Sequence, residues 1–291
     1  MAISKLLQGH EKDLGGGFMV RRLLPSAALQ AVGPFIFFDH FGPIDVAPGA
    51  NHDVRPHPHI GLATVTYLFE GAMLHRDNIG SVQRIEPGAI NWMTAGAGIV
   101  HSERTPPDLA DRPHRTHGLQ LWAALPLAHE EDAPSFAHTP AAALPVVTLD
   151  GAVVTVLVGS AFGETSPVHT YSQTLYLDVA LPAGQELLLP GLPAEAAIYP
   201  ISGELEIDGV TLALHTMALL DSASAPLLCA STQARFVVIG GEPLDGPRFI
   251  LWNFVSSSKE RIEKAADDWA EQRYPAIAGE TEWMPLPTAP R

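Results

Sequence analysis

Two pairs of polar residues in the stretch 55–105 constrain the fold of this chain most. The pairs are His57 with His59 and His101 with Glu103, and the members of each pair are two positions apart. Residues i and i+2 of a β-strand point to the same face of a sheet. Two such strands lying side by side would bring three imidazoles and one carboxylate to one point. This donor set suits a divalent transition metal.

Short apolar runs separated by turns surround these pairs. The runs at 63–69, 72–77, 81–85, 89–93, 99–103 and 117–124 are rich in β-branched and aromatic residues, and turns containing glycine, proline or asparagine separate them. Strands and turns that recur about every 8–12 residues are typical of an all-β sandwich or barrel. We therefore expect an all-β domain that carries the metal site.

The second half of the chain repeats this pattern of strands and turns. We expect strands at 146–159, 175–181, 185–189, 196–202, 204–207, 210–214, 218–220 and 235–240. The stretch 127–145 is acidic, rich in alanine and proline and poorly periodic, which is typical of a linker. The sequence thus predicts two domains, residues 1–145 with the metal site and residues 146–291 without one.

The C-terminal part of the chain changes to a helical pattern. Ser257 stands three residues before Glu260, the spacing of a capping box at a helix N-terminus. An apolar stripe at helical spacing follows, and Pro275 ends it. We expect this helix to pack its stripe against a domain.

Composition limits the partners and the compartment of the chain. The formal net charge of −15 argues against direct binding to nucleic acid or to an anionic membrane surface. No apolar run reaches the roughly 18 residues that a transmembrane helix needs. The single cysteine, Cys229, excludes an intrachain disulfide, and the N-terminus lacks the apolar stretch of a signal peptide. We therefore expect a cytoplasmic protein.

Four segments resemble one known family. They are GPFIFFDHFGP at 33–43, PHPHIGLATVTYLFEG at 56–71, IEPGAINWMTAGAGIVHSE at 85–103 and HGLQLW at 117–122. Together they strongly resemble the pirin family over roughly residues 18–125. The second half of the chain, including WNFVSSSKERIE at 252–263, resembles the C-terminal region of pirins more loosely.

The resemblance implies a bicupin, which consists of two cupin-type β-barrels. It implies one metal in the N-terminal barrel, with His57, His59, His101 and Glu103 as ligands. Iron, as Fe2+, is the expected metal, and zinc, nickel, manganese, cobalt and copper are alternatives.

Some pirins are similar to quercetin 2,3-dioxygenases, which open a flavonol ring with O2. In such a reaction the metal would bind the enolic oxygen of a small aromatic substrate. Glu103 would accept the proton of that oxygen as a general base.

The chain departs from the family pattern beside the first histidine pair. The family often reads HPHRGFET where this chain reads HPHIGLAT, so that Ile60 replaces an arginine and Ala63 replaces a glutamate. We expect these replacements to change the charge of the pocket and the preference for substrate.

Two other functions stay open at this stage. In the first, the metal senses redox state and the protein regulates a protein partner. In the second, the metal is structural, although structural zinc sites often use cysteines and none stands near these histidines. The sequence leaves the choice between catalysis and regulation open.

Overall fold

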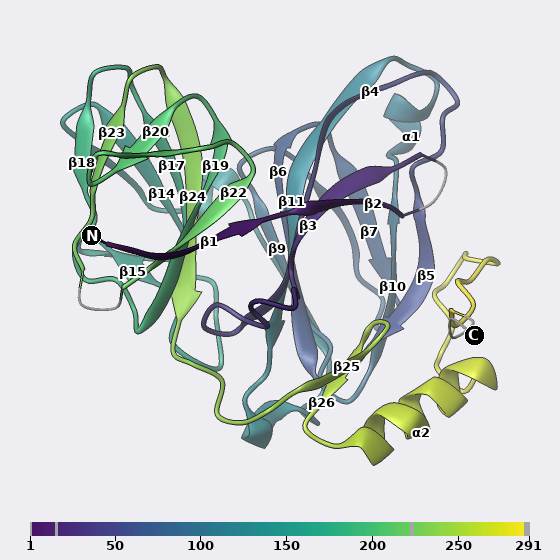
Figure 1. The fold of residues 1–291 in the computed structure, drawn as a ribbon. Coiled ribbons are helices and arrows are strands. Elements are labelled where there is room, and N and C mark those ends of the chain that lie inside the picture. The colour runs from purple at the N-terminus through teal and green to yellow at the C-terminus, as the bar shows by residue number, and fades with distance from the viewer. Residues whose placement is uncertain (1, 15–16, 222–223, 288–291) are drawn as a thin grey trace. The chain divides into compact units, whose positions relative to one another are not determined.

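A computed structural model describes residues 2–14, 17–221 and 224–287 of the chain (Figure 1). Most of these residues lie in β-strands, and the described part of the chain contains two short 3-10 turns and the α-helices α1 (Pro107–Ala110) and α2 (Lys259–Ala270). The prediction of an all-β fold with a C-terminal helix is confirmed. Neither α-helix in the described ranges is long and apolar enough to cross a membrane.

Two compact units make up the chain, and each combines separate stretches of sequence. One unit comprises Met1–Lys12, Arg21–Asp39 and Thr139–Leu244, and the other comprises Asp13–Val20, His40–His138 and Asp245–Arg291. The cut predicted after residue 145 stays a prediction. In the structure, each unit also includes segments from the other side of that cut.

The unit that contains residues 40–138 holds both polar pairs. Its smaller sheet has four strands within the described residues, in the order β5 (Val54–His59), β10 (Ile99–Arg104), β7 (Met73–Asp77) and β8 (Val82–Ile85). A seven-stranded sheet runs in the order β12 (Ser135–Thr139), β9 (Ile90–Thr94), β6 (Leu62–Glu70), β11 (His114–Ala124), β4 (Phe35–Val46), β3 (Met19–Leu24) and β2 (His10–Asp13). The unit boundary at residues 39 and 40 falls within β4.

The other unit repeats this combination of a seven-stranded and a four-stranded sheet, as far as the structure describes it. The larger sheet runs in the order β1 (Ile3–Gln8), β22 (Thr216–Leu220), β19 (Glu195–Ser202), β24 (Ala234–Gly241), β17 (Thr174–Leu181), β14 (Ala152–Val158) and β13 (Val146–Leu149). The smaller one runs in the order β18 (Glu186–Leu188), β23 (Leu227–Ala230), β20 (Leu205–Ile207) and β21 (Val210–Leu212). One apolar core fills this unit, with Val154, Leu177, Ile198, Leu205 and Phe236 among its fully buried members.

The stretch predicted as a linker is structured instead. It contains two 3-10 turns (Leu127–His129 and Ala141–Ala143) and β12, which is the edge strand beside β9. The Glu130 side chain is buried and its Oε1 lies 2.7 Å from Nε of Arg248. The linker prediction was wrong because the polar residues of this stretch find partners far along the chain, which local periodicity does not reveal.

The C-terminal segment begins with a hairpin and continues into α2. The hairpin consists of β25 (Phe249–Leu251) and β26 (Phe254–Ser256), drawn in yellow-green before the helix in Figure 1. The helix begins one residue later than predicted, because Ser258 is the N-cap and its Oγ accepts a hydrogen bond from the backbone N–H of Arg261. The Oγ of Ser257 instead donates to Glu130, 2.7 Å away.

The predicted apolar stripe of α2 is buried. Ile262, Ala265 and Trp269 pack in a cluster with Ile60 and Val100, which are the direct sequence neighbours of His59 and His101. The helix therefore supports the back of the two strands that carry the histidines.

Candidate metal centre

The pairing of β5 with β10 brings three predicted ligands together. The two strands are antiparallel, and their register places His57 opposite His101 and His59 opposite Ile99. One ring nitrogen from each of His57, His59 and His101 lies within 4.8 Å of the other two. All three side chains are buried. The structure thus gathers the three imidazoles at one point, and their role as metal ligands stays a prediction.

Backbone carbonyls hold two of the three imidazoles through Nδ1. Nδ1 of His57 donates to the backbone carbonyl of Arg55 at 2.8 Å, and Nδ1 of His59 donates to that of Asn253 at 3.2 Å. A neutral imidazole that donates through Nδ1 has its lone pair on Nε2. These contacts leave Nε2 as the atom of each ring that could bind a metal.

Burial keeps these imidazoles in the form that binds metals. Desolvation lowers the pKa of His57 to about 4, and desolvation and then the neighbouring histidines lower the pKa of His59 and of His101 well below the usual value. Nε2 of His59 lies 3.1 Å from Nε2 of His101. The three residues therefore fit a divalent transition metal.

Glu103 lies on the same strand as His101, two residues further along. Its carboxylate is not among the groups that approach one another within 4.8 Å, and the β5–β10 register shifts between His101 and Glu103. The hydroxyl of Thr66 lies 3.5 Å from its Oε1. Burial raises the pKa of Glu103 to about 7, although the hydrogen bond from Thr66 acts in the opposite direction. Glu103 as the fourth ligand stays a prediction.

Side chains of the larger sheet face the histidines. The Trp122 ring is centred 5.2 Å from that of His59, and Thr66 Oγ1 donates to Oε1 of Gln120 at 2.9 Å. In the strand register, Thr66 is the neighbour of both Asn91 and Gln120, so the three share one face of the sheet. This polar face was not predicted from the sequence. The signal for it was the alternation within the strand at 63–69.

The two departures from the family pattern lie away from this face. Ile60 packs in the cluster with Phe254 and Ile262 behind the metal strands. Ala63 is fully buried and, three positions from Thr66, points to the opposite side of β6. This placement does not support the expected effect of either residue on the charge of the pocket.

The same unit contains further histidines, among them His52, His75, His114 and His117, and His75 contacts the cluster. Its Nδ1 lies 3.4 Å from Nδ1 of His101. His52 stacks on Phe18, Nδ1 of His114 donates to the backbone carbonyl of Arg112, and His117 pairs with His40 at 2.8 Å. These contacts of His52, His114 and His117 lie outside the histidine cluster.

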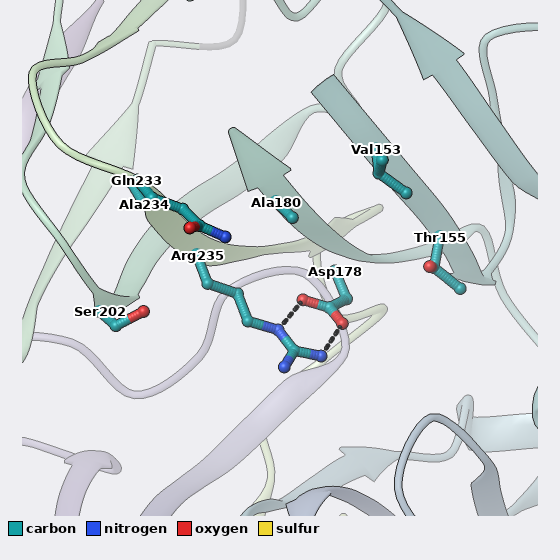
Figure 2. Close-up of a pocket in the computed structure, with 8 residues that line it drawn as sticks. All are labelled: Val153, Thr155, Asp178, Ala180, Ser202, Gln233, Ala234 and Arg235. Atoms are coloured by element: carbon teal, nitrogen blue, oxygen red, sulfur yellow. Dashed lines mark hydrogen bonds and ion pairs between the residues drawn. The ribbon is translucent and has the colours of Figure 1, made fainter. Parts of the chain in front are cut away.

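A separate pocket lies on the larger sheet of the other unit (Figure 2). Its lining consists of Val153, Thr155, Asp178, Ala180, Ser202, Gln233, Ala234 and Arg235. The guanidinium of Arg235 makes two bonds to the carboxylate of Asp178, at 2.9 and 2.5 Å. The charges of Arg235 and Asp178 therefore neutralise each other. The residues that line this pocket do not form a set of metal ligands. We place the candidate centre at the histidines.

Comparison with known proteins gives the family. The pirin family model matches residues 17–123, and the model of the pirin C-terminal cupin domain matches residues 176–275. A pirin-like protein from Caulobacter vibrioides is 44% identical over 290 residues, which cover 98% of this chain and 99% of the relative. The chain belongs to the pirin family. The predicted resemblance and the bicupin fold are thereby confirmed.

Two solved structures are similar to this chain in fold. The crystal structure of a quercetin 2,3-dioxygenase from Acinetobacter baumannii matches with a TM-score of 0.91 and 34% identity, covering 98% of this chain and 95% of that chain. The bacterial pirin YhhW from Escherichia coli, solved in complex with nickel(II), matches with a TM-score of 0.64 over 82% of this chain and 99% of that chain. At 16% identity this second likeness shows the fold alone.

Proposed function

We propose that this pirin is a metal-dependent dioxygenase that acts on a small, flavonol-like aromatic substrate with O2. The observation that carries the proposal is the cluster of three buried, neutral imidazoles of His57, His59 and His101, with Glu103 two residues from His101 on the same strand. The likeness to a quercetin 2,3-dioxygenase at 34% identity supports the substrate class.

The three histidines and Glu103 would hold the metal, which we propose to be Fe2+. Three imidazoles and a carboxylate suit iron among several first-row transition metals, so zinc, nickel, manganese, cobalt and copper are the alternatives to test. When bound, the metal supplies positive charge that lowers the pKa of an enolic hydroxyl of the substrate. Iron as the resident metal and a cytoplasmic location stay predictions.

Glu103 is proposed to act as the general base. A carboxylate with a pKa of about 7 can accept a proton from a substrate hydroxyl at neutral pH, and the Thr66 hydroxyl lies close to its Oε1. The Trp122 ring against His59 and the buried strands around the site would limit the access of water to this transfer. The neighbouring amide of Gln120 offers a polar contact for an oxygen of the substrate.

The test combines metal analysis with an oxygen assay. The purified chain is loaded with Fe2+ without oxygen, its metal content is measured, and quercetin absorbance and O2 are followed after mixing with air-saturated buffer. We expect one metal per chain and equal consumption of quercetin and O2. Fully loaded protein that consumes neither quercetin nor related flavonols would contradict the proposed activity.

Variants at the site separate the possible roles of the metal. For His101→Ala we expect loss of metal and activity with a small change in melting temperature, because the metal is proposed to act in catalysis. For Glu103→Gln we expect activity to fall at least about 100-fold, the usual contribution of a general base. A collapse of stability in His101→Ala would instead indicate a structural metal.

The regulatory alternative stays a prediction as well. A redox-sensing pirin would bind a protein partner in a way that changes with the metal oxidation state, and it would not consume flavonols. The same oxygen assay therefore decides between this alternative and the proposed enzyme.

A further inference from the structure

We propose that His75 and Asp77 form a positioning pair for His101. The pair fixes the orientation of the His101 ring and determines which of its two nitrogens carries the hydrogen. The inference rests on the metal site of the proposed function, and it names two residues that do not themselves belong to the ligand cluster. Both lie on β7, the strand that pairs with β10 on the side opposite β5, and the register places Asp77 directly beside His101.

The contacts form a chain of three side chains. Nε2 of His75 lies 2.9 Å from Oδ2 of Asp77, and Nδ1 of His75 lies 3.4 Å from Nδ1 of His101. The side chain of Asp77 is fully buried and that of His75 is 6% exposed. The ring of His75 also stacks on Phe136, with a centroid distance of 4.3 Å and an interplanar angle of 15°. The imidazole is thus fixed on its face and at both nitrogens.

The carboxylate of Asp77 determines the direction of these hydrogen bonds. Its Oδ1 accepts the backbone N–H groups of Ile79 and Ser81, at 3.1 and 2.8 Å, so the carboxylate cannot turn. As an acceptor, Oδ2 requires the hydrogen of His75 to be on Nε2. In a neutral imidazole, Nδ1 of His75 then carries a lone pair and accepts from Nδ1–H of His101.

This direction leaves the lone pair of His101 on Nε2, which faces Nε2 of His59 at 3.1 Å. The backbone carbonyls of Arg55 and Asn253 accept from Nδ1 of His57 and His59, and so leave the lone pairs of these two rings on Nε2 as well. A hydrogen-bond partner at the ring nitrogen that does not bind the metal fixes the tautomer of a ligating histidine and raises its basicity. The pair formed by His75 and Asp77 therefore performs, for His101, the task that a carbonyl performs for His57 and His59.

The variant Asp77→Asn reverses this hydrogen-bond direction while it keeps the size of the side chain. The amide oxygen would remain on the two backbone N–H groups, because they require an acceptor, and the NH2 group would face His75. Nε2 of His75 must then accept, so its hydrogen moves to Nδ1 and points at His101. The hydrogen of His101 moves to Nε2 and blocks ligation there.

The experiment measures the affinity for Ni2+ and the tautomers of the metal-free protein. Ni2+ is titrated against a chromophoric chelator, and 15N-labelled histidine is observed by NMR, with the signals of residue 101 assigned through His101→Ala. For wild type we expect the hydrogen of His101 on Nδ1. For Asp77→Asn we expect the hydrogen on Nε2 and an affinity for Ni2+ reduced about 10- to 100-fold.

A second variant and a matched control test the pairing itself. His75→Phe keeps the stack on Phe136 and removes the link, and the double variant with Asp77→Asn should weaken Ni2+ binding no more than the stronger single variant. The control is Asp132→Asn, which alters another His–Asp pair of the same unit, with Nδ1 of His129 2.7 Å from Oδ2 of Asp132 and both side chains more than a third exposed. The control should leave Ni2+ affinity unchanged.

The outcomes separate this inference from the proposed function. Unchanged Ni2+ affinity in Asp77→Asn, or a hydrogen on Nε2 of His101 in the wild type, overturns the positioning role and leaves the proposed dioxygenase standing. Additive losses in the double variant also overturn it. Tautomers as expected, combined with a wild type that consumes no flavonol, support the positioning pair and reject the proposed activity.

Discussion

Gly61 shows how tightly a single residue is constrained beside the metal strands. It has a positive φ of 67°, and a Cβ added to it would lie 2.0 Å from the backbone oxygen of Val255. This glycine lets the chain turn from β5 into β6 directly under the C-terminal hairpin. A side chain at this position would both strain the backbone and push the hairpin away.

We therefore predict that Gly61→Ala strongly destabilises the protein. The left-handed backbone alone costs about 1–3 kcal/mol for a residue with a Cβ, and the overlap with Val255 adds to that. Urea denaturation followed by circular dichroism measures the free energy of unfolding. The matched control is Gly49→Ala, which has a φ of 75° and no atom within 4 Å of the added Cβ. Equal losses in the two variants would show that the contact with Val255 is unimportant.

At the scale of elements, α2 matters because it packs behind the histidine strands. Ile262 lies in the cluster with Ile60, Val100, Phe254 and Trp269. The sequence predicted the apolar stripe of this helix, because its period of 3.6 residues is a local property. It did not predict the surface that the stripe covers, and it placed the N-cap at Ser257 because two neighbouring serines compete for that position.

Ile262→Ala tests this packing. Removing a buried isoleucine side chain is expected to lower the free energy of unfolding by about 2–5 kcal/mol. Glu263→Ala, on the exposed side of the same helix, should change it by less than about 0.5 kcal/mol and serves as control. Thermal and urea denaturation of both variants give the comparison. A loss below about 1 kcal/mol for Ile262→Ala would mean that α2 contributes little to the strands.

For the whole molecule, the decisive feature is that the two compact units interleave along the chain. The fragment 1–145 lacks Asn253, whose carbonyl accepts from His59, and it lacks the buried face of α2. The fragment 146–291 lacks β1, which pairs with β22. No single cut in the sequence separates the units.

We predict that neither fragment folds cooperatively alone and that co-expression of the two restores folding. Thermal unfolding by circular dichroism and titration with Ni2+ measure both properties, with the intact chain as reference. A sharp unfolding transition of the isolated fragment 1–145, together with Ni2+ binding equal to that of the intact chain, would contradict this expectation. The physical reason is that each fragment exposes apolar and hydrogen-bonding surface that the missing segment covers.

The sequence by itself determined the features that depend on local spacing. The alternation of apolar residues predicted the strands, and the spacing of two placed His57 and His59 on one face of their strand. The motifs around these histidines also identified the family. Such features can be read directly, because strand and helix periods repeat within a few residues.

Only the tertiary structure decided which distant groups complete the site. It brought Asn253 to His59 across 194 positions, set His75 and Asp77 beside His101, and left the Glu103 carboxylate outside the imidazole cluster. It also buried Glu130 within a stretch that is polar and aperiodic in sequence. Strand register and burial depend on contacts between segments far apart in the chain, and no local period encodes them.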